Sequence, residues 1–194
     1  LREPNFINVI TKQKNEKTIV SIRNTMSELD DSKMKKFMTK FGGKKADKVV
    51  AISKMVKKDQ IDKYGVDENK IEVIYNACNL DKVKKMANEK IEDKKINEII
   101  ENNQGYIVMN IGRLTYQKGQ DKLIRAFKKV VKEVKNAKLL IFGKGELKEE
   151  LQELIKSLEL ENNVILAGFY DNPYKFLKKA NIFAFSSMFE GLGN

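Results

Sequence analysis

Several residue types that carry common enzyme chemistry are absent or scarce in this sequence of 194 residues. It contains no histidine and no tryptophan, and Cys78 is its single cysteine. Zinc clusters, Cys–His nucleophiles, Ser–His–Asp triads and an internal disulfide are therefore excluded within the chain. No apolar run reaches the ~18 residues that a membrane-spanning helix needs. Hydrophobic residues make up 41% of the sequence, which is enough for a packed core and excludes intrinsic disorder.

What the sequence has in excess is positive charge. Lysine and arginine total 38 against 27 acidic residues, a formal net charge of +11. Such a balance attracts anions: nucleic acid, anionic lipid headgroups or phosphorylated substrates. The charge is spread along the chain and lacks the basic stripe and aromatic stacking platforms of nucleic-acid binders, so no nucleic-acid partner is expected. A surface on which lysine is simply the default residue explains most of the excess equally well.

Short apolar runs alternate with segments of helical periodicity in the first part of the chain. Strands are predicted at residues 17–22, 48–52 and 71–75, and helices at residues 4–10, 31–40 and 54–64. The second of these helices has its apolar residues at the i, i+3, i+4, i+7 spacing of an amphipathic helix: Met34, Phe37, Met38 and Phe41. Gly42 and Gly43 are predicted to end it, and Ser53 is predicted to cap the next helix.

The pattern changes after residues 79–103, which we interpret as a helical, solvent-facing connector between two domains, 1–78 and 104–194. Beyond the connector, strands predicted at 106–111, 137–142, 164–167 and 182–185 alternate strictly with helices at 120–134, 146–158 and 173–179. Alternation with short connections indicates an α/β fold with a parallel, doubly wound sheet. Ligands of such sheets bind beyond the carboxyl ends of the strands. Glycines, Arg113, Lys118 and Glu190 occur at those ends.

The segment from Gly112 to Gly119 (GRLTYQKG) links a predicted strand to a predicted helix. Glycine permits close approach of the backbone to a ligand, and a helix N-terminus offers unpaired N–H groups and a positive dipole. Arg113 and Lys118 add two cations to the same loop. The chemistry is that of a diphosphate clamp, and the alternative is a basic turn whose lysine faces solvent.

Two further segments are weaker signals. The segment Gly143–Gly145 (GKG) lacks the third glycine of a dinucleotide fingerprint, so it favours a tight turn under a ligand and argues against a dehydrogenase. The segment Ser186–Asn194 (SSMFEGLGN) places a carboxylate beside two glycines after the last strand. Glu190 there is a candidate acceptor for sugar hydroxyls, and the glycine amides are candidate phosphate ligands. A surface turn is the structural alternative.

These motifs, taken in order, resemble a known family. The runs GRLTYQKGQDKLIRAFKKV, LLIFGKGE, NVILAGFYDN and NIFAFSSMFEGLGN are similar to the donor-binding half of the family 4 retaining glycosyltransferases of the GT-B fold. The upstream run ADKVVAISKMVKKDQIDKYGVDENKIEVIYNACN is similar to the end of that family's first domain. It departs from the family's Asn-Gly-Val-Asp at Asn76–Asn79, and the histidine that members often place at the active-site edge is absent.

The resemblance implies roles for individual residues. Arg113 and Lys118 would bind the donor diphosphate and stabilise the leaving nucleotide, and Glu190, the first Glu of a Glu-x7-Glu motif, would contact the donor sugar; these three form the expected catalytic set. The wider donor-binding set also contains Gly112, Gly143, Gly168, Phe169, Tyr170, Ser187, Gly191, Leu192 and Gly193, with the base expected at 168–170. Arg23, Asn24 and Asn76 are expected to line the interdomain cleft.

The implied reaction is transfer of a sugar from a nucleotide diphosphate sugar, expected to be UDP-linked, to a hydroxyl with retention. No cofactor or metal is expected, because there is no Asp-x-Asp motif and two cations stand at the diphosphate. The expected acceptor is a polyprenyl-diphosphate-linked sugar or saccharide, used by a cytoplasmic enzyme peripheral to the inner face of a bacterial membrane. The alternatives are a GT-B epimerase or phosphorylase and a non-catalytic anion-binding module. The sequence looks cut at both ends from a longer enzyme, so the chain alone is expected to be inactive.

Overall fold

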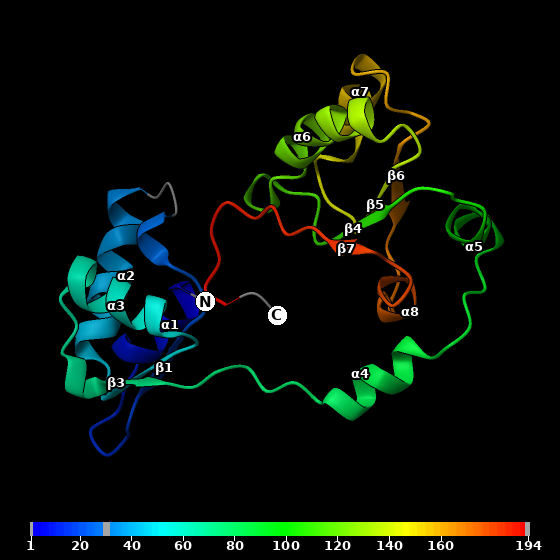
Figure 1. Ribbon diagram of the computed structural model, residues 1–194. Helices are drawn as coiled ribbons and strands as arrows, with labels where there is room; N and C mark the ends of the chain where they lie inside the picture. Colours follow the sequence, from blue (N-terminus) through cyan, green and yellow to red (C-terminus); the bar gives the residue numbers. More distant parts are fainter. Residues whose placement is uncertain (1, 29–31, 193–194) are drawn as a thin grey trace. The chain divides into compact units, whose positions relative to one another are not determined.

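The computed structural model describes residues 2–28 and 32–192, and it divides into two units. The first comprises the described residues up to Cys78 together with Phe189–Leu192, and the second comprises Asn79–Met188. Figure 1 shows the described residues up to Cys78 in blue to cyan, the second unit in green to red, and Phe189–Leu192 in red. Each unit is an α/β structure with its own parallel sheet, which confirms the predicted fold class. The predicted strands are all present, with ends within two residues of those expected.

The first unit is built on three parallel strands in the order β1-β2-β3: β1 (Ile19–Ile22), β2 (Lys48–Ala51) and β3 (Ile71–Val73). Its helical elements are α1 (Arg2–Ile10), η1 (Met26–Glu28), α2 (Lys33–Lys45), α3 (Lys54–Tyr64) and η2 (Glu68–Lys70). Val20, Val49 and Val56 are at most 1% exposed and form the centre of its core. Ser53 caps α3 as predicted, because its hydroxyl accepts from the Val56 N–H at 3.2 Å.

The prediction that Gly42 and Gly43 end a helix is wrong, because α2 continues through them to Lys45. Both glycines are buried, and they serve packing. A Cβ at position 42 would lie 3.8 Å from the backbone nitrogen of Phe6 in α1, and one at position 43 would lie 2.7 Å from the Val66 side chain. The close approach of Val66 therefore requires a small residue at position 43, whereas position 42 has room for a methyl group. The sequence alone cannot distinguish such a packed glycine from one that ends a helix.

The apolar stripe of α2 lies on the surface of the first unit. Met34 is 64% exposed and Phe37 is 53% exposed, whereas Thr39 and the two glycines form the buried face. Phe37 and Phe41 pack against the ring of Phe6 from α1, with ring centres 6.4 and 5.5 Å away. The periodicity correctly indicated a helix. Phe41 at the end of the stripe packs against the core, but Met34 and Phe37 are exposed, so the stripe does not coincide with the buried face.

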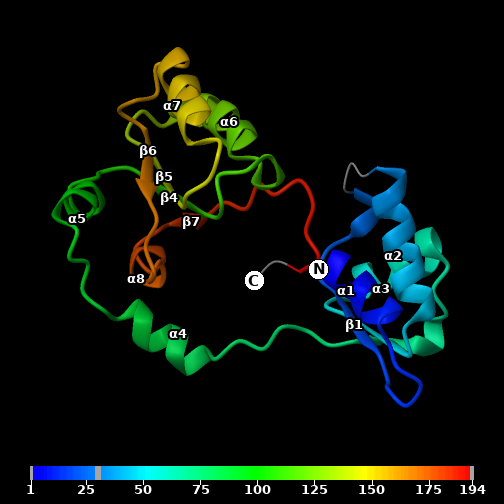
Figure 2. The same cartoon turned by 180° about the vertical axis from the view of Figure 1, so that it is seen from behind.

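The second unit is a parallel sheet in the order β6-β5-β4-β7, formed by β4 (Ile107–Ile111), β5 (Lys138–Phe142), β6 (Val164–Gly168) and β7 (Ile182–Phe183). Its helical elements are α4 (Leu80–Ala87), α5 (Lys94–Glu101), η3 (Tyr116–Lys118), α6 (Gln120–Glu133), α7 (Lys148–Ser157) and α8 (Tyr174–Leu177). Figure 2, from behind, shows α6 and α7 on one side of the sheet and α8 on the other.

Alternate side chains of β5 supply the two cores of the second unit. Leu139 and Ile141 point toward α6 and α7, while Leu140 and Phe142 join the cluster that contains Phe176 of α8. A strand buried on both faces has to be apolar, and the four buried residues of β5 that follow Lys138, LLIF, satisfy this requirement. The second unit is therefore a three-layered α/β/α structure.

Residues 79–103 belong to the second unit. Helix α4 buries none of its residues, but α5 buries Ile96 and Ile100 in the same cluster as Phe176. The segment is thus helical as predicted, and its second helix contributes to a core instead of facing solvent throughout. The functional boundaries at residues 78 and 104 stay a prediction.

No helix within the described ranges combines the length and apolarity needed to cross a membrane.

Candidate functional site

The strand order of the second unit defines where a ligand can enter its sheet. The chain passes from β4 to β5 and β6 on one side, and then returns to place β7 on the other side of β4. Such a reversal leaves a crevice at the carboxyl ends of the two strands where the connections diverge. The segments that leave β4 and β7 at this point are residues 112–119 and 184–188.

The loop 112–119 is fixed by main-chain hydrogen bonds and by one left-handed glycine. Gly119 has φ 61°, and a Cβ there would overlap the carbonyl oxygen of Ser186 in the segment after β7. The Ser186 hydroxyl donates to the Lys118 carbonyl at 2.8 Å, and the Met188 N–H donates to the Gln117 carbonyl at 2.8 Å. The two segments that flank the crevice are therefore joined directly.

Glycines also join the ends of the neighbouring strands. The Gly112 N–H donates to the Phe142 carbonyl at 2.9 Å, and the Gly143 N–H donates to the Gly168 carbonyl at 2.8 Å. Gly143 has φ 150°, and a Cβ there would overlap the Gly112 carbonyl oxygen. Gly112, Gly143 and Gly168 therefore form one continuous edge across β4, β5 and β6, and the glycine at 143 is required by this close approach.

Two cations stand on this edge. The Arg113 side chain is exposed, and Lys118 is half-buried with its Nζ 5.6 Å from the centre of the Phe185 ring. Helix α6 begins directly after the loop, at Gln120, with Gly119 as its N-cap residue. The loop 112–119, which we call the cationic loop, thus carries an arginine and a lysine and leads into a 14-residue helix whose first amides are available, and these are groups that bind phosphate.

A cavity of about 700 Å³ adjoins the same edge, which is within the size range of small-molecule sites. Its lining includes Gly112, Arg113, Gly143, Lys144, Phe169 and Tyr170. Phe169 is 56% exposed, and the Lys144 ammonium lies 4.7 Å from its ring centre. The cavity therefore combines an accessible aromatic face with the cationic loop.

Tyr170 packs against the rings of Phe142 and Phe176 and is held by a hydrogen bond. Its hydroxyl donates to Asp93 Oδ2 at 2.6 Å, and the other oxygen of Asp93 accepts from the Ile96 N–H at the start of α5. The hydrogen bond from Tyr170 lowers the pKa of the Asp93 carboxyl. Burial, together with this bond, raises the pKa of Tyr170 to about 12. Tyr170 is thus a neutral donor at physiological pH, and it fixes the loop that carries Phe169.

Ser187 and Thr115 contribute buried hydroxyl oxygens near the crevice. Neither oxygen has a hydrogen-bond partner among the residues that the structure describes, and the same holds for Oε1 of Gln120. Buried polar atoms are normally paired, so unpaired ones next to a cationic loop are consistent with a polar ligand or ordered water there.

Glu190, Gly191 and Leu192 belong to the first unit. The Thr25 hydroxyl donates to the Glu190 carbonyl at 3.0 Å, and a Cβ at Gly191 would overlap the Arg23 carbonyl oxygen. Leu192 packs against the core of this unit. The structure therefore brings Glu190 and Gly191 together with the Arg23–Thr25 turn, whereas Arg113 and Lys118 lie in the second unit. Gly193 lies outside the described residues.

The turn that receives Glu190 is itself held by a buried carboxylate. Asp59 on α3 is 7% exposed and accepts from the Met26 N–H at 2.9 Å and from the Ser27 hydroxyl. Arg23 and Asn24 follow β1 directly, and Asn76 follows β3. Sequence reasoning missed Asp59, since a polar residue in a helix carries no sign of being buried. It missed Thr25 because the partner of this residue, Glu190, lies 165 positions away.

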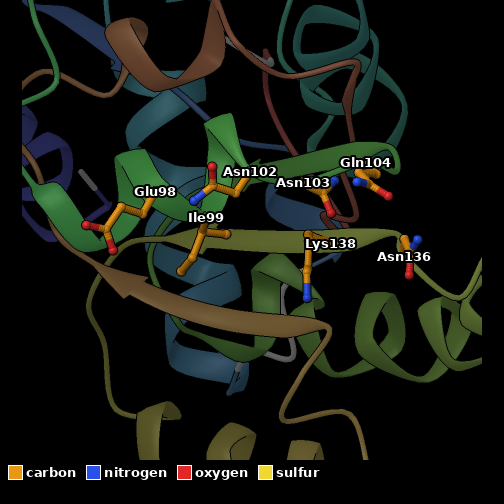
Figure 3. Close-up of a pocket in the computed structure, with 7 residues that line it drawn as sticks. All are labelled: Glu98, Ile99, Asn102, Asn103, Gln104, Asn136 and Lys138. Atoms are coloured by element: carbon orange, nitrogen blue, oxygen red, sulfur yellow. The ribbon is translucent and has the colours of Figure 1, made fainter.

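A second hollow lies at the opposite edge of the sheet in the second unit (Figure 3). Its volume is about 400 Å³, and its lining residues are Glu98, Ile99, Asn102, Asn103, Gln104, Asn136 and Lys138. Asn136 and Lys138 stand at the amino-terminal start of β5, so this hollow faces away from the loops described above. None of the residues singled out from the sequence lines it.

Within the described ranges, no three or more Asp, Glu or Cys side chains gather to form a metal site, and metal independence stays a prediction.

Two family models match the chain. The model described as "Glycosyl transferases group 1" matches residues 91–194, and the one described as "Glycosyltransferase Family 4" matches residues 12–82. An uncharacterized glycosyltransferase of Methanocaldococcus jannaschii is 50% identical over 127 residues, covering 66% of this chain and 30% of the relative. A Campylobacter jejuni enzyme that transfers N-acetylgalactosamine to a diphospho-undecaprenol-linked saccharide is 34% identical over 203 residues, covering 100% of this chain and 52% of the relative.

Solved structures share the fold. The Anabaena protein HepE, crystallised with UDP and glucose, has a TM-score of 0.77 at 19% identity, covering 96% of this chain and 51% of its own. TarM of Staphylococcus aureus, crystallised with UDP, has a TM-score of 0.72 at 24% identity, covering 93% of this chain and 34% of its own. The chain thus spans at most about half the length of these proteins, and its fold is of the GT-B type.

Proposed function

This chain belongs to the glycosyl transferases group 1 family, and from that premise we propose that the whole protein transfers a sugar from a nucleotide diphosphate sugar to a hydroxyl acceptor with retention. The observation that carries the proposal is the cationic loop at the reversal of the strand order. Arg113 and Lys118 stand there at the start of α6, beside the cavity that Phe169 lines. In this proposal residues 104–194 bind the donor, and residues 1–78 are the acceptor-side domain.

Charge on the leaving diphosphate is the main requirement of such a reaction. Cations and helix amides that are already in place stabilise that charge without reorganisation in the transition state. Arg113 presents a fork of donors for phosphate oxygens, and Lys118 adds a point charge. Glycines at 112 and 143 keep the edge free of side chains, so the phosphates approach the backbone closely.

The cavity beside the loop suits the nucleoside. An exposed aromatic face such as Phe169 stacks on a base, and Tyr170 holds its loop in place. UDP is the proposed nucleotide because HepE and TarM were both crystallised with it. Ser187 and Glu190 would then serve the phosphates and the sugar hydroxyls, together with Gly191, Leu192 and Gly193.

The proposed acceptor is a polyprenyl-diphosphate-linked sugar or another saccharide. The support is the Campylobacter jejuni relative, whose acceptor is linked to diphospho-undecaprenol. Such an acceptor would bring the protein to the cytoplasmic face of a membrane as a peripheral protein. A net charge of +11 favours contact with anionic lipid.

The test is transfer of a labelled sugar by the whole protein and by three variants, Arg113→Ala, Lys118→Ala and Glu190→Ala. Loss of a charge-assisted contact should reduce donor turnover by about 10-fold to 100-fold in each. Arg125→Ala, on the exposed surface of α6, is the matched control and should retain full activity. Product analysis distinguishes transfer from epimerisation and phosphorolysis, and anomeric analysis tests retention. Unchanged rates in all three variants would refute the site.

A further inference from the structure

Two buried amide side chains lie beneath the cationic loop of the second unit. Asn110 is on β4 and is 2% exposed, and Gln120 is the first residue of α6 and is 1% exposed. Asn110 is the one polar residue in a strand whose sequence is otherwise apolar, IVMNI. Burying an amide costs free energy unless it is hydrogen-bonded, so such a residue needs partners in the fold.

The partners of this pair lie on both sides of the crevice. Gln120 Nε2 donates to the Arg113 carbonyl at 3.0 Å, and a longer contact of 3.5 Å joins it to Asn110 Oδ1. Asn110 Nδ2 donates to the Ala184 carbonyl at 2.8 Å, at the end of β7. The two amides thus connect the loop that follows β4 with the segment that follows β7.

The backbone at Arg113 is consequently held from several directions. Its carbonyl accepts from Gln120 and from the Thr115 N–H at 2.9 Å, and the next residue, Leu114, donates to the Lys144 carbonyl at 3.1 Å. The guanidinium therefore extends from a fixed peptide, and its position changes only through the side-chain torsions of Arg113. A group held in this way loses less freedom when it binds a ligand.

We propose that Gln120, supported by Asn110, is a positioning residue that fixes Arg113 for the diphosphate of the donor. The inference rests on the proposed function and adds a residue to its machinery. Arg113 is the group that would meet the diphosphate, whereas a nucleoside would lie against Phe169, which the amide pair does not contact. Loss of the Gln120 amide should therefore weaken binding of the diphosphate and leave binding of the nucleoside unchanged.

The variant that tests this is Gln120→Met, which keeps the volume of the side chain and removes its donor. The 194-residue chain is titrated with UDP by calorimetry and with uridine by NMR. We expect the Kd for UDP to rise up to about 10-fold, as for loss of one neutral hydrogen bond, while the Kd for uridine changes less than about twofold. Gln152→Met, on the exposed surface of α7, is the matched control and should leave both constants unchanged.

A double-variant cycle separates positioning from general loosening of the fold. If Gln120 acts through Arg113, then Gln120→Met should add nothing to the loss in UDP affinity caused by Arg113→Ala. If Gln120→Met fails to fold, the unaltered chain still provides a readout. Its Gln120 side-chain amide and Arg113 backbone amide signals should shift when UDP is added and stay in place when uridine is added.

The outcomes distinguish failure of this inference from failure of the proposed function on which it rests. If the unaltered chain binds neither UDP nor uridine, the proposed function fails and the inference fails with it. If it binds UDP, but Gln120→Met weakens UDP and uridine equally or leaves both unchanged, only the inference is wrong. Additive losses in the cycle, or identical amide shifts with both ligands, would overturn it as well.

Discussion

The two units of this chain are built from the same alternating elements, yet their strand orders differ. In the first unit the order β1-β2-β3 follows the chain, whereas in the second unit β7 returns to the other side of β4. A reversal separates the connections and leaves a crevice at the strand ends. The cationic loop and its glycines follow the strands of the unit with the reversal. Strand order therefore distinguishes two similar sheets in what they can bind.

The units also differ in how their loops are held. In the second unit the strand ends meet through main-chain hydrogen bonds at Gly112, Gly143 and Gly168. In the first unit, side chains hold the segments that follow the strands: Asp59 holds the turn after β1, and Ser53 caps α3. A change of backbone freedom at these glycines should therefore damage the second unit, and loss of the Asp59 carboxylate or the Ser53 hydroxyl should affect the first.

The largest effect is expected from Gly143→Ala. The new methyl group would overlap the Gly112 carbonyl, at a φ of 150° that other residues rarely adopt. We expect the second unit to lose more than about 3 kcal/mol of stability, from backbone strain and overpacking together. Amide hydrogen exchange read by mass spectrometry should show the loss in the second unit, residues 79–188, and not in the first. Gly42→Ala is the control from the first unit, where a Cβ meets ordinary contacts, and it should change stability by less than about 1 kcal/mol.

A smaller loss, confined to the first unit, is expected from Asp59→Ala. The change leaves the buried Met26 N–H without its acceptor, which should cost about 2–3 kcal/mol. Asp62→Ala removes an exposed carboxylate from the same helix and should cost almost nothing. Urea unfolding combined with hydrogen exchange would measure both variants. Equal effects of the two changes would contradict the role given to Asp59.

Loss of a helix cap gives the next effect in size. Ser53→Ala should destabilise the first unit by about 1 kcal/mol, since the Val56 N–H loses its side-chain acceptor. Ser157→Ala, at the exposed end of α7, removes a hydroxyl that caps no helix N-terminus, and a change below about 0.5 kcal/mol is expected. Thermal unfolding of the two variants side by side tests whether the first unit depends on this side chain.

The smallest effect concerns the pH ranges in which each unit loses stability. The hydrogen bond from Lys12, with that from the Thr18 N–H, holds the pKa of Asp47 far below its ordinary value of 3.8. That contribution to the first unit is present above pH 3.8 and is lost as the pH falls toward the folded-state pKa. Asp93 gives the second unit a dependence of the same sign.

The alkaline range separates the units. Because the pKa of Tyr170 rises from 10.0 to about 12, its contribution to the second unit is complete below pH 10.0 and is lost as the pH rises toward 12. Tyr170→Phe should abolish this alkaline loss, and Asp47→Asn should leave it intact. Pulse proteolysis across both pH ranges, with the cleaved peptides assigned to each unit, would measure it. An alkaline loss that persists in Tyr170→Phe would refute the assignment.

Much of the fold could be predicted because local patterns determine it. Each strand is a short apolar run between polar or glycine-containing segments, and the Ser53 cap is a local interaction. The error at Gly42 and Gly43 arose because the sequence alone does not distinguish a glycine that ends a helix from a glycine that is packed inside one. Only contact with Phe6 and Val66 distinguishes them.

The place of the candidate site in the fold could be predicted where its residues lie within one loop. Arg113, Lys118 and the glycine edge follow from strand–loop–helix order, since parallel strands place their carboxyl ends together. The supporting contacts could not be predicted, because they join distant positions. Tyr170 meets Asp93, 77 residues away, and Asn110 meets Ala184, 74 residues away. The polar Asn110 inside an apolar strand is the one local sign that could have indicated such a contact.

The glycine edge has a consequence for how a protein of this kind can diversify. Its strand ends are joined through backbone atoms at Gly112, Gly143 and Gly168, so the joint does not depend on the neighbouring side chains. The side chains of Lys144 and Phe169 line the cavity and are not part of these backbone hydrogen bonds between the strand ends. Substitutions at these two positions should therefore change the lining of the cavity while the strand ends stay joined.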